Sequence, residues 1–129
     1  MNNKVKRYEL NDNVTVDMLV KNGFRKCGFI DAITKPKYYY SQYLSLNVYV
    51  QIEISVKTDE TLYFDDYISV SVIDDNFGQP YYPFYDKDQD FDYLNSIIDK
   101  YNSIMYKFME GGIFTEINVP TKKLANNGR

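Results

Sequence analysis

The clearest pattern in the chain is a strict alternation of apolar and polar residues over positions 44–57. The apolar positions are Leu44, Leu46, Val48, Val50, Ile52, Ile54 and Val56. Successive side chains of a strand point to opposite faces, so this period predicts one long strand with one buried face. A strand whose other face is exposed to solvent is typical of an antiparallel sheet.

Shorter signals predict more strands. Residues 24–30, interrupted at Gly28, and residues 38–43 predict two strands before the long one. Residues 63–73 predict a second long strand with Ile68, Val70 and Val72 inward and Tyr67, Ser69 and Ser71 outward. A hairpin turn follows at 74–78, where Asn and Gly tolerate positive φ.

Three segments near the ends of the sheet are less regular. Residues 81–85 predict a tyrosine-rich edge strand, because the neighbouring Pro80 and Pro83 cannot donate ladder hydrogen bonds. Residues 113–119 predict a last strand. Residues 1–10 are polar and basic, and predict either a frayed arm or an edge strand.

Two helices are predicted. Thr15 can cap a short helix that ends at Gly23, with Met18 and Leu19 as its buried residues. A longer helix is expected from a cap at Asp90 to about Glu110. Its apolar residues recur every three or four positions, at Phe91, Leu94, Ile97, Ile98, Tyr101, Ile104, Met105 and Phe108.

Together these elements predict an α+β domain over residues 1–120, with residues 121–129 as a flexible polar tail. An antiparallel β-meander of three to five strands packs on one long C-terminal helix, and a short N-terminal helix covers an end. The outer sheet face would present Tyr49, Gln51, Glu53, Tyr67, Ser69 and Ser71.

Composition excludes several chemistries. The 129 residues contain no histidine, no tryptophan and one cysteine, Cys27. Imidazole bases, cysteine–histidine nucleophiles and disulfides within the chain are therefore excluded. The sequence has no membrane span, no signal peptide and no phosphate-binding glycine loop, so we expect a cytoplasmic protein that is not an enzyme and has no cofactor.

Charge is unevenly spread. Residues 58–99 carry eleven acidic residues and one basic residue, Lys87, whereas the flanking segments are net basic. An acidic segment repels phosphates, so direct nucleic-acid binding is not expected there. It is suited to docking on a basic protein surface, and the alternative is a solvated face that aids solubility.

The alternating carboxylates of 86–92 do not form a calcium loop. Phe91 stands where the loop needs glycine, and Ile97 stands where it needs a bidentate glutamate. We instead expect these acids to cap the long helix. Asp65-Asp66 and Asp74-Asp75 lie at opposite ends of a predicted strand, too far apart for paired-carboxylate catalysis.

Fourteen tyrosines are the remaining signal. They cluster at Tyr38, Tyr39, Tyr40, Tyr43 and Tyr49, and again at Tyr81, Tyr82 and Tyr85. If the two clusters meet, they form an aromatic patch of the kind found at interfaces, whereas the alternative is that many of them pack in the core. The predicted partner-binding residues are Tyr49, Tyr67, Tyr81, Tyr82, Tyr85, Asp65, Asp66, Asp86 and Asp88.

The segment Leu19-Val20-Lys21-Asn22-Gly23-Phe24 resembles the start of small, mostly uncharacterised phage and prophage proteins of gut bacteria. The resemblance covers residues 10–110 in outline, with a short helix, long alternating strands and a C-terminal helix. It implies an accessory protein that binds and inhibits host machinery, such as a defence or nucleic-acid-binding factor.

The leading hypothesis is therefore a non-enzymatic accessory protein that docks on a basic host protein, with carboxylates in place of phosphates. A small-molecule or nucleotide-sequestering protein and a structural virion component are the alternatives. A homodimer through an edge strand is also compatible with the sequence.

Overall fold

Five antiparallel strands form the main sheet of the computed structural model, which describes residues 5–26, 37–56 and 67–117. Their order is β2-β3-β4-β5-β6, so each strand lies beside its neighbour in sequence. The bounds are β2 Arg25–Lys26, β3 Tyr38–Tyr43, β4 Val48–Ser55, β5 Tyr67–Asp74 and β6 Gln79–Pro80. The predicted meander is confirmed.

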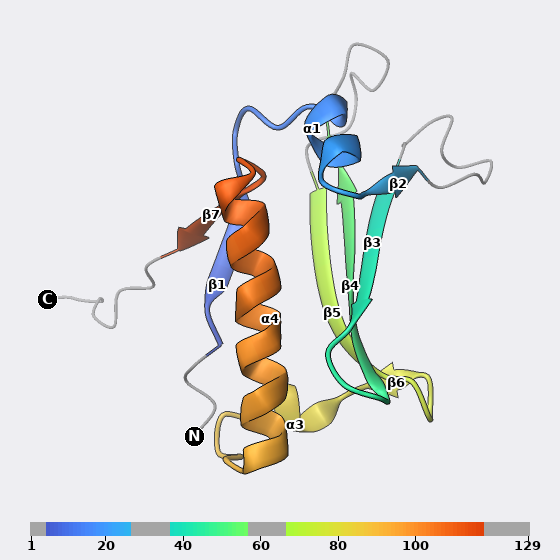
Figure 1. Ribbon diagram of the computed structural model, residues 1–129, viewed down its shortest axis with the longest axis vertical. Coiled ribbons are helices and arrows are strands. Elements are labelled where there is room, and N and C mark those ends of the chain that lie inside the picture. Colours follow the sequence, from blue (N-terminus) through green and yellow to red (C-terminus); the bar gives the residue numbers. More distant parts are fainter. Residues whose placement is uncertain (1–4, 27–36, 57–66, 118–129) are drawn as a thin grey trace, which may run out of the picture.

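The long helix α4, Asp92–Glu110, covers one face of this sheet (Figure 1). Seven residues of its apolar stripe are buried, namely Leu94, Ile97, Ile98, Tyr101, Ile104, Met105 and Phe108. The short helix α1, Val16–Lys21, lies at one end of the sheet and is capped by Thr15, whose Oγ1 accepts from the Met18 N–H at 3.3 Å. The two-layer α+β architecture is thus confirmed.

A second, two-stranded sheet joins the two ends of the described chain. β1, Arg7–Leu10, pairs antiparallel with β7, Phe114–Ile117, so that Tyr8 lies opposite Glu116. Of the two predictions for the N-terminal segment, the edge strand is therefore correct for residues 7–10. This ribbon lies beside α4 (Figure 1).

Aromatic rings fill the core between the helix and the sheet. Phe108 of α4 lies with its ring centroid 5.2 Å from Phe24, 4.8 Å from Tyr40 and 6.0 Å from Phe114. At the middle of α4, Tyr101 packs with its ring centroid 4.9 Å from Phe84. Tilted and edge-to-face rings at these separations are favourable beyond the area that they bury.

Two local strand predictions are wrong. Residues 82–85 form a short helix, α3 (Tyr82–Tyr85), because Pro83 has the fixed φ that a first helical turn needs. The strand that pairs with β5 at this edge is instead formed by residues 79–80. Leu46 is 91% exposed because the chain turns between β3 and β4 there, so the strand begins only at Val48, although Leu44 is also buried.

The acidic run also does not cap α4. Phe91 occupies the N-cap position with no side-chain hydrogen bond, and Asp90 instead accepts from the Asn95 amide at 2.9 Å. Asp86 accepts from the backbone N–H of Asp88 at 2.9 Å and thereby closes the turn before the helix. Asp92 does lie in the first helical turn, where the helix dipole favours an anion.

Several of the predicted segments fall outside the described ranges. The predicted strand residues 27–30 and 63–66, Cys27 and the tail 121–129 lie outside the described residues. Within the described ranges, no helix is long and apolar enough to cross a membrane.

Candidate functional site

The outer face of the sheet carries a pocket with a cavity volume of about 540 Å³, here named the tyrosine pocket. It lies where β4, β5 and β6 meet the start of α3. Its lining residues are Tyr49, Ser71, Val72, Ile73, Gly78, Gln79, Pro80, Tyr82 and Tyr85. None of these residues is charged, so the pocket is an aromatic and apolar surface with a few polar atoms.

Strand register explains why these residues meet. In an antiparallel pair, directly opposed residues share a face, and Tyr49 lies opposite Ile73 while Gln51 lies opposite Ser71. Ile73 in turn lies opposite Pro80 of β6. The turn between β5 and β6 contains Gly78 at φ +61°, a left-handed conformation that favours glycine. The tight hairpin thus brings Pro80, and then Tyr82, back toward Tyr49.

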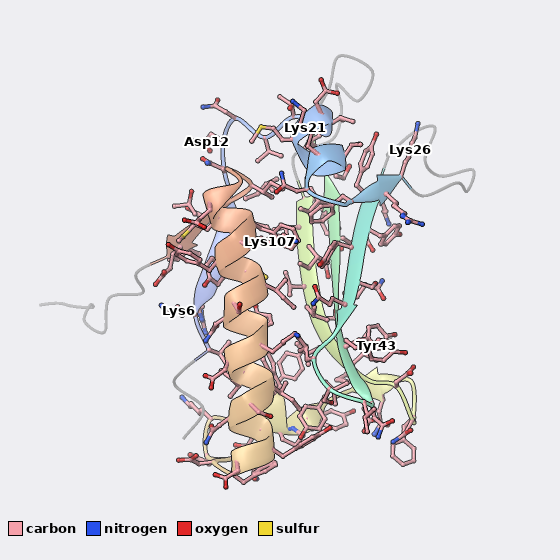
Figure 2. All side chains as sticks on the ribbon, in the orientation of Figure 1. Lys6, Asp12, Lys21, Lys26, Tyr43 and Lys107 are labelled. Atoms are coloured by element: carbon pink, nitrogen blue, oxygen red, sulfur yellow. The ribbon has the colours of Figure 1, made fainter. Side chains whose placement is uncertain are left out.

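Tyr43 and Asp75 extend the aromatic surface beyond Tyr49. The Tyr43 ring lies edge-on to Tyr49 with centroids 5.7 Å apart, and its hydroxyl donates to an Asp75 carboxylate oxygen at 2.7 Å. That hydrogen bond to Asp75 raises the pKa of Tyr43 above its usual value. Figure 2 shows Tyr43 on the side of the sheet away from α4. The Asp75 carboxylate is thus connected to the tyrosine pocket through the rings of Tyr43 and Tyr49.

The predicted tyrosine residues separate into three environments. Tyr49, Tyr82 and Tyr85 line one pocket, and the last two are 60% and 53% exposed. Tyr81 is half-buried against the core, and burial raises its pKa. Tyr67 is exposed but lies opposite Ser55, six residues along β5 from Ile73, or about 20 Å away at ~3.3 Å per residue.

The early tyrosine cluster is likewise divided by the two faces of β3. Tyr38 and Tyr40 lie opposite Ile54 and Ile52 and face the core, whereas Tyr39 and Tyr43 lie on the outer face. The Tyr40 hydroxyl donates to the Gln42 side chain. The two sequence clusters therefore meet only through Tyr43 and Tyr49 on one side and Tyr82 and Tyr85 on the other.

Among the predicted acidic residues, the two that the structure describes do not line the tyrosine pocket. Asp86 and Asp88 are exposed in the segment that follows Tyr85, and Asp86 uses both carboxylate oxygens within its own turn. Asp65 and Asp66 lie outside the described residues. On the outer face, the Glu53 carboxylate forms a salt bridge with Lys37, with Oε2 and Nζ 3.1 Å apart. The exposed acids nearest in sequence to the tyrosine pocket are Asp75 and Asp86.

Sequence reasoning missed Gly78, Gln79 and Pro80 as pocket residues. Pro80 was used only as evidence for an edge strand at residues 81–85, although it forms part of the lining. The sequence did contain a signal for them, because Asn76 and Gly78 indicate a tight hairpin. A tight hairpin brings the residues that follow it back alongside β5. Ser71 was placed correctly on the outer face.

The chemistry of the tyrosine pocket favours recognition. Tyrosine faces attract Arg and Lys side chains through the ring quadrupole, and aromatic pockets are common anchor sites of protein interfaces. Among the described residues, no group of three or more His, Cys, Asp or Glu side chains is arranged to hold a metal ion.

Comparisons with known proteins support the fold. No protein-family model matches the chain, and no curated protein matches it. Among solved structures, the chain is similar to a DUF1831 family protein (Lp2179) from Lactobacillus plantarum, with a TM-score of 0.60 and 16% sequence identity. The match covers 85% of this chain and 86% of the other. At that identity the likeness shows the shared fold alone.

Proposed function

We propose that this protein is a non-enzymatic binding protein that recognises a basic surface of a partner protein through the tyrosine pocket. The observation that carries the proposal is the convergence of Tyr49, Tyr82 and Tyr85 on one pocket of about 540 Å³. An Arg or Lys side chain of the partner would lie against these rings. Exposed tyrosines also bring large contact area at little cost in side-chain entropy.

The exposed negative charge of the acidic segment supports the same kind of partner. Asp75, Asp86, Asp88, Asp90, Asp92 and Asp99 are all exposed in the described part of the acidic segment. Asp75 is connected to the pocket through Tyr43 and Tyr49, and Asp86 follows Tyr85. Exposed carboxylates accelerate the association of a cationic partner and disfavour an anionic one. A partner surface that ordinarily binds phosphates has the required charge.

The biological setting of the proposal comes from the sequence resemblance. We propose a phage or mobile-element accessory protein whose partner is a host protein that it inhibits, such as a defence factor. The comparisons link the chain to no phage protein, so this origin stays a prediction.

Affinity capture with matched variants tests the proposal. The immobilised wild type, Tyr82→Ala and Tyr106→Ala are each exposed to the same lysate of the source or host cell. Tyr106 is a suitable control because it is 52% exposed on α4 and does not line the tyrosine pocket. The partner should bind the wild type and Tyr106→Ala, and should be lost with Tyr82→Ala.

Salt provides the second measurement. The captured partner should dissociate when the salt concentration rises from about 0.1 M to about 0.5 M, because screening weakens attraction between exposed charges. Equal capture by all three proteins would contradict the role of the pocket. Binding that does not respond to salt would contradict the electrostatic part.

A further inference from the structure

A second pocket, with a cavity volume of about 770 Å³, opens between the two sheets and is here named the basic pocket. Its lining comes from the segment of β1, from β5, from α3 and the turn after it, from α4 and from β7. The lining residues are Val5, Lys6, Arg7, Tyr8, Val70, Phe84, Tyr85, Lys87, Tyr101, Met105 and Ile117. Its volume lies within the range of about 300–1,000 Å³ that is typical of small-molecule sites.

The sheet topology leaves this space open. β1 lies near β5, but the two strands belong to different sheets. β6 pairs with β5 only at Ile73 and Asp74, and the next edge position, Val72, is bonded by Tyr81 and Tyr85. At Val70, which pairs with Ile52 of β4, β6 does not continue along the other edge of β5, and Val70 lines the pocket.

Among the described residues, the lining of the basic pocket includes three cationic residues and no acidic residue. They are Lys6, Arg7 and Lys87, and none of them forms a salt bridge within the described residues. Figure 2 shows Lys6 beside β1. Glu116 of β7 lies opposite Tyr8 and is not part of the lining. Lys87 lies between the exposed Asp86 and Asp88, so the positive charge of the lining comes chiefly from Lys6 and Arg7.

The hydroxyl of Tyr101 adds a neutral hydrogen-bond donor to the lining of the basic pocket. Tyr101 is 6% exposed and lines the pocket, and its hydroxyl makes no hydrogen bond with any described residue. Burial, together with the neighbouring Tyr8 and Tyr85, raises its pKa, so the group remains a protonated donor at neutral pH. Asn95 Oδ1 is the buried side-chain atom without a partner among the described residues, so the Tyr101 hydroxyl still reaches solvent and can donate to a ligand oxygen in the pocket.

We propose that the basic pocket binds a small organic anion with an apolar body. Its carboxylate or phosphate is compensated by Lys6, Arg7 and Lys87, and an acceptor oxygen takes the hydrogen bond of Tyr101. The apolar body lies on the hydrophobic part of the lining, formed by Val5, Val70, Phe84, Met105 and Ile117. This site is independent of the proposed partner-binding function, since only Tyr85 lines both pockets.

The test uses the full chain and three anionic probes. Anilinonaphthalene sulfonate, which fluoresces in apolar sites, is titrated into the folded protein. Decanoate and adenosine monophosphate are then added as competitors. We expect saturable binding at one site. Displacement by decanoate identifies a carboxylate amphiphile, and displacement by the nucleotide identifies a phosphate with an aromatic body.

Four variants locate the site. Lys87→Glu should weaken binding of the sulfonate about tenfold, because it reverses one of three charges. Tyr101→Phe should weaken it about fivefold, because it removes one hydroxyl and almost no volume. Lys100→Glu, an exposed lysine of α4 outside the lining, should leave affinity unchanged. So should Tyr82→Ala, which alters only the tyrosine pocket.

Each outcome decides the matter, provided that circular dichroism shows a native fold for every variant. Absence of saturable binding by all three anions overturns the proposal. So does binding that either Lys87→Glu or Tyr101→Phe leaves unchanged, or that Lys100→Glu weakens as much as Lys87→Glu. Loss of binding with Tyr82→Ala would assign the probe to the tyrosine pocket and would also overturn it.

Discussion

The backbone N–H of Val72 donates a hydrogen bond of 2.9 Å to the hydroxyl oxygen of Tyr85. On the same residue, the carbonyl oxygen accepts from the backbone N–H of Tyr81 at 2.9 Å. The Tyr85 side chain thus supplies a hydrogen-bond acceptor to the edge of β5 at a position that β6 does not reach. Because Tyr85 lines both pockets, this contact also fixes the wall between them.

Removal of the Tyr85 hydroxyl should destabilise the fold. In Tyr85→Phe, the partly buried N–H of Val72 loses its acceptor, so we expect the free energy of unfolding to fall by about 1 kcal/mol. Urea denaturation followed by circular dichroism measures the change. Tyr82→Phe is the control, because that side chain is 60% exposed. Equal stability of the two variants would show that the hydrogen bond contributes nothing measurable.

Stability should fall at alkaline pH. The pKa values of Tyr8, Tyr40, Tyr81 and Tyr101 are raised, in each case chiefly by burial. In the unfolded chain these groups ionise near pH 10, whereas in the folded protein they still hold their protons at that pH. The folded state therefore binds more protons, and stability decreases as pH rises from about 10 toward the folded pKa values. Below pH 10 the contribution is fully present.

Tyrosinate absorbance measures this directly. Titration of the native protein should show a group of tyrosines that ionise at higher pH than the same residues in urea. Tyr101→Phe should remove the most strongly shifted of them and flatten the loss of stability with pH. Superimposable titrations of the native and urea-unfolded protein would contradict the expected shifts.

Periodicity predicted the central elements because burial there follows the period of the backbone. The alternation of Val48, Val50, Ile52 and Ile54 became the inner face of β4, and the stripe from Leu94 to Phe108 became the buried face of α4. In both cases one apolar face meets one partner layer, so local pattern and tertiary packing agree.

The candidate site was less predictable because it depends on strand pairing and on turns. Sequence alone predicts no register, and register decides that Tyr49 lies opposite Ile73 while Tyr67 lies at the far end of β5. The change from strand to helix at Pro83 likewise depends on how the chain leaves β6. Lys6 and Lys87 are 81 positions apart in the sequence, and no local pattern predicts that they line one pocket.

Truncation of Phe108 should be among the most damaging single changes. Its side chain is fully buried and contacts three aromatic rings, so Phe108→Ala leaves a cavity at the centre of the core. We expect a loss of about 3–5 kcal/mol in the free energy of unfolding. Tyr106→Ala, two residues away on the exposed side of α4, should lose far less in the same urea experiment. A similar loss in both variants would contradict this description of the core.

The close approach of α1 and the end of α4 gives a further prediction. A Cβ atom on Gly111 would lie 2.5 Å from the Asn22 side-chain oxygen. Asn22 cannot move freely, because its amide donates to the Met18 carbonyl at 2.7 Å. The φ angle of Gly111 is −77°, so the backbone itself accepts alanine. We expect Gly111→Ala to cost about 1–3 kcal/mol through this clash alone.

A double-mutant cycle separates the clash from other effects of the substitution. Asn22→Ala loses its own hydrogen bond to Met18, but it also removes the atoms that the new methyl group of Gly111→Ala would meet. The double variant should therefore be more stable than the sum of the two single losses predicts, with a coupling of about 1 kcal/mol or more. Additive losses in urea denaturation would mean that the cost at Gly111 arises elsewhere, and that the ends of α1 and α4 do not pack against each other at Asn22.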